Sequence, residues 1–150
     1  MKNIFDSEVT AELIGRINRL TPATRPLWGK MSVSQMLAHC CVSYEQVYEN
    51  KYPKPGFLKT LLLQLFVKRM VVNETPYKRN IPTTPDFKVQ DNRNFEAEKQ
   101  RLITYIRKTQ QLGRSSFENR PSHSFGPLTS QEWNNLFYKH LDHHLTQFGV

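Results

Sequence analysis

The sequence predicts an all-α protein: a four-helix bundle with a long excursion that contains an extra helix between helices 2 and 3. Three observations support this fold. Apolar residues recur at helical spacing in four separate stretches, two of these stretches open with a capping box, and no stretch alternates apolar and polar residues as a half-buried strand does. The 150 residues fit a single domain that spans 1–150.

The first two helices are expected over about 6–20 and after Ser32. Thr21-Pro22 ends the first, because proline cannot continue a helix. The second opens with a capping box, in which Ser32 and Gln35 each satisfy a free backbone N–H of the other. Its apolar stripe consists of Val33, Met36, Leu37, Cys40, Tyr44 and Val47.

The third helix is expected over 94–112, with Gly113 as its terminator. The fourth runs over 129–148 and opens with a second capping box. Between the second and third helices, the apolar segment 57–70 predicts an extra helix that packs in the excursion. The proline-rich stretch 75–87 predicts a long loop.

Charge and composition exclude several classes of function. The net charge is +8, and segment 51–93 carries +6 of it as basic residues spread singly and in pairs. Nucleic-acid arms concentrate such residues in runs or along one helix face, so we expect no nucleic-acid partner. The segment is interpreted as a solvated basic face, or as a means of attracting anionic small molecules.

The sequence also indicates a cytoplasmic protein with no membrane partner. Cys40 and Cys41 are adjacent, which excludes a relaxed disulfide and favours a reducing compartment. No signal peptide is visible, and lysine, arginine and glutamine interrupt the strongest apolar run, over 57–72. The two cysteines are interpreted as small buried hydrophobic residues.

Two histidines occupy the apolar stripe of the fourth helix. With Trp133 taken as zero and about 100° per residue, His140 lies at about 340° and His144 at about 20°, alongside Phe137 and Leu141. Side chains four residues apart share a helix face, so both imidazoles can bind one metal ion. The alternative is that each is a hydrogen-bonded structural histidine, which requires partners for its buried nitrogens.

A third histidine strengthens the metal interpretation. His39 lies two turns into the second helix, and the early half of one antiparallel helix can lie beside the late half of another. His39, His140 and His144 would then form a three-nitrogen site with coordination positions left for water or substrate. The glutamate of a zincin motif is absent after His140, which disfavours metalloprotease chemistry.

Two further residues have two interpretations each. His123, in the tight loop that leads into the fourth helix, either lines the mouth of the site or braces the loop by hydrogen bonds, and we favour the second. Trp28, between Pro26 and Gly29, is expected to close one end of the bundle, with stacking on a cofactor as the alternative.

Two stretches resemble the DinB/YfiT-like superfamily of metal-dependent helical-bundle enzymes: Trp28-Gly29-Lys30-Met31-Ser32-Val33-Ser34-Gln35-Met36-Leu37-Ala38-His39 and Tyr138-Lys139-His140-Leu141-Asp142-His143-His144-Leu145-Thr146-Gln147-Phe148-Gly149. In that superfamily a histidine follows the capping residues of the second helix. The last helix carries the motif His-x-x-His-His, with a glutamine three residues after the final histidine. The stretch from His123 to Thr129 resembles an uncharacterised subgroup. The resemblance implies His39, His140 and His144 as metal ligands.

Relatives in that superfamily imply metal-dependent transfer or isomerisation that uses a low-molecular-weight thiol, and a homodimer. We therefore expect a divalent-metal-dependent enzyme that transfers a thiol to a small electrophile, with zinc or nickel as the metal and iron also compatible. His143 is the candidate catalytic residue, as an outer-shell partner of the metal or a proton shuttle. The alternative is a non-catalytic metal-binding or stress-response protein.

Overall fold

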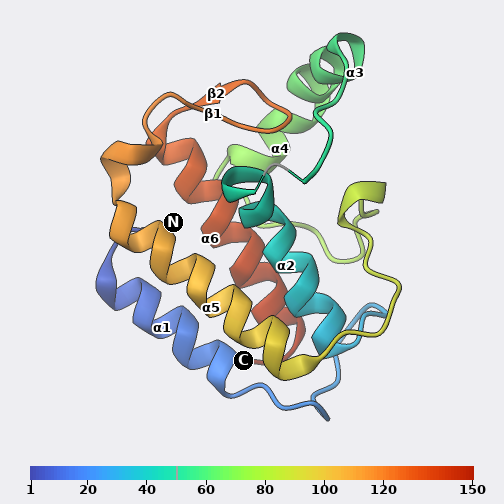
Figure 1. The fold of residues 1–150 in the computed structure, drawn as a ribbon. Coiled ribbons are helices and arrows are strands. Elements are labelled where there is room, and N and C mark those ends of the chain that lie inside the picture. The colour runs from blue at the N-terminus through green and yellow to red at the C-terminus, as the bar shows by residue number, and fades with distance from the viewer. Residues whose placement is uncertain (50) are drawn as a thin grey trace.

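Four long helices form the body of the protein. The computed structural model describes residues 1–49 and 51–150, and the long helices are α1 (Ser7–Asn18), α2 (Val33–Tyr48), α5 (Phe95–Leu112) and α6 (Ser130–Gln147). α5 lies between α1 and α2, and α6 contacts the same two helices from the other side (Figure 1). The predicted helical character is confirmed.

The helix ends follow their capping residues. Ser32 and Gln35 form the expected capping box at the start of α2, and Thr129 and Glu132 form the one at the start of α6. α1 ends at Asn18, two residues earlier than predicted. The backbone N–H groups that follow bond to carbonyls three residues back, which tightens the last turn before the proline.

Aromatic side chains fill the core between α2, α5 and α6. Phe137 stacks on Tyr44 with ring centroids 4.6 Å apart, and on Trp133 at 5.3 Å. Phe117 meets the edge of Trp133 and is fully buried. Stacked and edge-on pairs of this kind add to the stabilisation from buried apolar area. This packing fixes the rotation of α6 about its axis and therefore the direction of its histidines.

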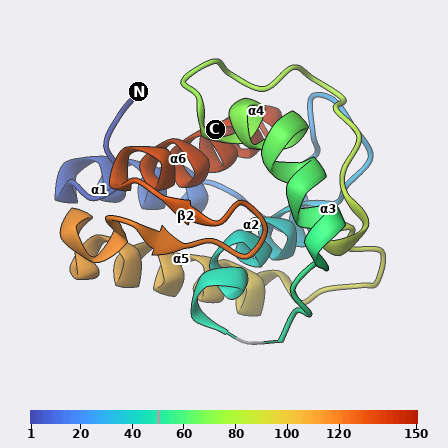
Figure 2. The same ribbon diagram turned by 90° about the horizontal axis from the view of Figure 1, so that it is seen from above.

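The excursion contains one continuous helical segment, formed by α3 (Phe57–Leu62), the π-helical turn η1 (Leu63–Val67) and α4 (Lys68–Val72). Figure 2 shows it across the bundle from α1 and α5. A loop with the 3₁₀ turn η2 (Pro85–Phe87) then leads to α5. The expected extra helix is present and two residues longer than predicted.

This helix lies in the excursion, but the apolar side chains of its outer face are exposed. Phe57 and Phe66 are 86% and 75% exposed. The inner face meets the rest of the protein, but no element in the described part of the chain covers the outer one. None of the helices within residues 1–49 and 51–150 is both long and apolar enough to cross a membrane.

A small hairpin precedes α6. The 3₁₀ turn η3 (Arg114–Phe117) leads into β1 (Arg120–Pro121), which pairs antiparallel with β2 (Pro127–Leu128). The sequence predicts a tight loop here, and the two-residue pairing closes that loop. The hairpin places 122–125 on the wall of the cavity that the histidines of α6 also line.

Candidate metal centre

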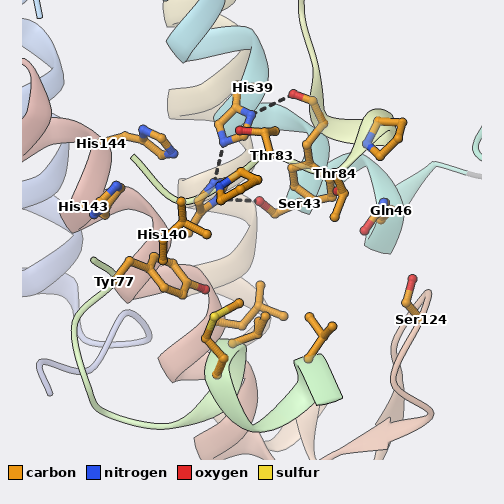
Figure 3. A pocket seen from close by; sticks show the side chains of 18 of the residues that line it. His39, Ser43, Gln46, Tyr77, Thr83, Thr84, Ser124, His140, His143 and His144 are labelled. Carbon is orange, nitrogen blue, oxygen red and sulfur yellow. Dashed lines mark hydrogen bonds between the residues drawn. The ribbon is translucent and has the colours of Figure 1, made fainter. Parts of the chain in front are cut away.

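The three histidines predicted as ligands lie together between α2 and α6. His39 projects from α2, while His140 and His144 project from successive turns of α6 (Figure 3). One ring nitrogen from each lies within 4.8 Å of the others. The Nε2 atoms of His39 and His140 are 2.9 Å apart. The structure therefore brings together two distant parts of the sequence, as the interpretation requires.

Each of these rings is held from behind through its Nδ1 atom. His39 Nδ1 lies 2.8 Å from the carbonyl oxygen of Phe87. His144 Nδ1 lies 2.7 Å from Oε1 of Gln147, and His140 Nδ1 lies 2.8 Å from Oγ of Ser43. Metal-binding histidines characteristically make such a second contact, because it fixes the tautomer and orientation of the ring.

The partners of His39 and His144 define which nitrogen carries the hydrogen. The Phe87 carbonyl can only accept, so His39 Nδ1 donates and its Nε2 presents a lone pair. The Gln147 amide nitrogen donates to the Trp28 carbonyl at 2.7 Å, which turns its oxygen toward His144. Ser43 leaves two tautomers open to His140, because a hydroxyl can donate or accept. If Ser43 donates to His140 Nδ1, His140 Nε2 donates to His39 Nε2; if Ser43 instead donates to the Cys40 carbonyl at 3.3 Å and accepts from His140, both Nε2 atoms carry free lone pairs.

Burial keeps these imidazoles neutral. Removal from water lowers the pKa of His39, and it holds the pKa of His140 well below its usual range. Burial also lowers the pKa of His144 to about 3, against a smaller opposing effect of the hydrogen bond with Gln147. Neutral imidazole is the form that binds a metal ion, so protons do not compete for these nitrogens near pH 7.

This donor set fits a divalent ion of borderline softness. The Nε2 atoms of His39 and His140 share a hydrogen bond at 2.9 Å, and a metal ion could take the place of the proton between them once His140 carries its hydrogen on Nδ1. Three imidazoles suit zinc and nickel, and iron is compatible. The cluster contains no carboxylate or thiol among the described residues. It could therefore hold one metal ion with positions left for other ligands.

His143, the predicted catalytic residue, lies next to this cluster but is not part of it. Its ring centroid is 5.0 Å from that of His144, and its flanks meet the edges of Trp28 and Tyr77 at 5.9 and 5.6 Å. Burial lowers its pKa, while Asp142 opposes the shift. Its catalytic role stays a prediction, but a half-buried, neutral imidazole here can accept a proton.

A cavity of about 640 Å³ opens beside the histidines. Its walls come from α2, α6, the helical segment 57–72 and the loops 77–87 and 122–125. In Figure 3, His143 and His144 lie on one side of this space and Ser124 on the other. The volume is typical of sites for small organic ligands.

Comparison with known proteins gives one match. Residues 5–149 match the model of a family described as a protein of unknown function, DUF1569. The chain belongs to the DUF1569 family. Neither the curated proteins nor the solved structures include a match to it.

The remaining predictions for this DUF1569 protein have mixed outcomes. His123 lines the cavity and also bonds Ser124 at 2.9 Å, so both interpretations apply. Trp28 lines the same cavity, with Arg79 stacked 4.3 Å from its ring, and is only half-buried. Cys40 and Cys41 are buried free thiols, as expected.

Sequence reasoning missed the groups that orient the ligands of this DUF1569 site. Ser43 lies four residues after His39 on α2, and Gln147 lies three residues after His144 on α6. The spacing of Gln147 places it beside the ligand that it orients, so a search of helix faces could have found its role. Ser43 orients His140 on the other helix, which no spacing within α2 indicates. The Phe87 carbonyl could not be found in this way, because a backbone group in a loop has no side-chain signature.

Proposed function

We propose that this protein is a divalent-metal-dependent enzyme of the DinB/YfiT-like, four-helix-bundle type that transfers a low-molecular-weight thiol to a small electrophile. One observation carries the proposal: three buried imidazoles bring one ring nitrogen each to within 4.8 Å of one another beside a cavity of ligand size. The sequence motifs around His39 and over 138–149 support the superfamily assignment. His39, His140 and His144 are the residues that would hold the ion.

The chain's own residues supply orientation and proton transfer. An ion held by three imidazoles would lower the pKa of a thiol or water that occupies its free position. Phe87, Ser43 and Gln147 keep the rings in place, so little reorganisation is needed when substrate binds. Burial excludes water and strengthens the electrostatic interactions within the site.

His143 is assigned as the proton acceptor. In the transfer, the thiol loses its proton, sulfur bonds to the electrophilic carbon, and the leaving group departs with the electron pair of the broken bond. His143 lines the same cavity, and its lowered pKa makes it neutral and able to accept near pH 7. Lys30 also lines the cavity and can attract a carboxylate of an anionic thiol.

The second candidate function is a non-catalytic metal-binding or stress-response protein. It is favoured by the contacts of His143, whose ring packs between Trp28, Tyr77 and His144 as the ring of a structural residue would. The two candidates differ in what metal removal changes.

The deciding experiment begins with elemental analysis of protein purified without added metal. The purified protein is then treated with a chelator, reloaded with zinc or nickel, and assayed against a panel of thiols and electrophiles. Thiol transfer that disappears on chelation and returns on reloading supports the enzyme. A change in melting temperature with no turnover at any metal supports the non-catalytic protein.

A further inference from the structure

The wall of the cavity beyond the histidines is mainly apolar. The inner face of the helical segment 57–72, the loop 77–87 and α6 all contribute to it. The main apolar wall residues are Leu63, Val67, Met70, Val71, Ile81 and Leu136. Polar thiols need hydrogen-bonding partners along their whole length, so a wall of this kind suits the other reactant.

The charges around the cavity restrict the ligand further. Lys30 lines it, and none of the described lining residues carries a carboxylate. A cationic ligand would be repelled by Lys30 and would find no opposite charge among those residues, whereas a neutral or anionic ligand would not be repelled. The imidazoles at one side are the only cluster of potential metal ligands within the described chain. A ligand would therefore place its metal-binding group at that side and its apolar body along the rest.

Within the helical segment 57–72, some residues line the cavity and their near neighbours in the sequence lie on the outer surface. Leu63 lines the cavity, whereas Leu65, two positions later, is 64% exposed. These two leucines offer the same chemistry in the same turn of helix, one inside the cavity and one outside it. They form a matched pair for testing what the cavity binds.

We propose that the second substrate of this site is a neutral or anionic compound with an alkyl or aryl body, which lies against Leu63 and Val67 while its polar end reaches the three histidines. This inference names the substrate class of the proposed enzyme. It rests on the proposed function only in one respect, the binding of the polar end of the substrate at the metal site. The apolar contacts are independent of the metal.

The test uses straight-chain hydroxamic acids, from acetohydroxamate through butano- and hexano- to octanohydroxamate, because the head group binds zinc, nickel and iron alike. Affinity for the zinc-loaded protein is measured by calorimetry. Each methylene that becomes buried should raise affinity about fourfold. Octanohydroxamate should therefore bind roughly 10-fold to 200-fold more tightly than butanohydroxamate.

The matched variants are Leu63→Gln and Leu65→Gln. Leu63→Gln should lower the affinity for octanohydroxamate by roughly fivefold or more, because it places a polar group against the alkyl chain of the ligand. It should leave the affinity for acetohydroxamate unchanged. Leu65→Gln should change neither affinity. Zinc content and melting temperature are measured for both, so that a misfolded variant is recognised. An equal effect of the two substitutions on octanohydroxamate would overturn the proposal.

Metal-free protein separates this inference from the proposed function. The same series is followed through the fluorescence of Trp28 and Trp133, which both line the cavity. Tighter binding with chain length in the metal-free protein supports the apolar cavity even if no metal is ever retained. Metal-dependent binding of acetohydroxamate with no gain from longer chains would overturn the substrate class and leave the metal site standing.

Discussion

Gln147, the last residue of α6, accepts a hydrogen bond from His144 through its Oε1 atom at 2.7 Å. The same side chain donates to the Trp28 carbonyl at 2.7 Å, and its backbone carbonyl accepts from the N–H of Leu27. A single residue therefore ties the ring of a proposed ligand to the segment that precedes α2. Gly29 in that segment leaves no room for a side chain, since an added Cβ would lie 2.6 Å from the Gln147 amide.

Replacement of Gln147 by leucine should weaken metal binding without removing a ligand. Loss of a second contact to a metal-binding histidine typically costs about 10-fold to 100-fold in affinity. We expect a loss of this size, with one ion still bound at saturation, measured by competition with a chromophoric chelator. Gln147→Glu should recover part of the loss, because a carboxylate also accepts from His144.

The control for this variant is Gln46→Leu. Gln46 lines the same cavity, and its described contacts include no hydrogen bond to the three histidines. Its replacement should leave metal affinity within about twofold. Equal losses in the Gln46 and Gln147 variants would show that polarity of the cavity, rather than orientation of His144, governs binding.

The ligand assignment itself predicts a sharp difference between histidines. His140→Ala or His144→Ala should abolish metal binding, because only two protein nitrogens would remain. His123→Ala should leave the stoichiometry unchanged, since its ring bonds Ser124 and lies outside the cluster. The measurement is metal content by elemental analysis after dialysis. Equal metal content in the wild type and the His144 variant would refute the assignment.

The sequence was sufficient to predict the helices and the candidate ligands, because both depend on periodicity. At about 3.6 residues per turn, residues four positions apart such as His140 and His144 lie on one stripe of the helix, and that stripe must face the core. The approach of His39 depends instead on which helices are neighbours, so it was inferred from antiparallel packing and from the resemblance. The structure confirms that approach through the 2.9 Å contact with His140.

Other features were beyond the sequence for physical reasons. The apolar pattern over 57–72 predicts a helix but gives no indication of what covers each face, and Phe57 and Phe66 are in fact exposed. The Phe87 carbonyl orients His39 from a loop whose path depends on proline geometry and distant contacts. A backbone group that contacts a side chain distant in the sequence leaves no recognisable pattern of residue types in the sequence.

Lys139 should contribute strongly to stability, although lysine is an unusual core residue. Its side chain is only 3% exposed, and its Nζ donates to the carbonyls of Met70 and Asn73 and to the Asn73 side chain. These bonds anchor the C-terminal end of the helical segment 57–72 to α6. Lys139→Met would leave these partly buried acceptors without their donor, and we expect a loss of about 1–3 kcal/mol in the free energy of unfolding.

Urea denaturation measures this loss, and Lys78→Met is the control because Lys78 is exposed. The control should change the free energy of unfolding by less than about 0.5 kcal/mol. Limited proteolysis adds a local readout, since the Lys139 variant should be cleaved faster within 57–72. A Lys139 variant as stable as the control would mean that water replaces the lost donor.

The buried thiols predict how stability depends on alkaline pH. Burial holds the pKa of Cys40 well above its usual range and raises the pKa of Cys41 to about 12, while both ionise near pH 8.5 in the unfolded chain. The thiols therefore hold fewer protons in the unfolded state than in the folded state above that pH, and the thiol contribution to stability falls as pH rises. Lys139, whose pKa burial lowers to about 8, makes a contribution of opposite sign over the same range. Between pH 9 and 10 the fall should approach about 1.4 kcal/mol per thiol per pH unit. Urea denaturation across this range tests it: Cys40→Ala should halve the thiol contribution to the slope, and an unchanged slope would show that Cys40 already ionises in the folded protein.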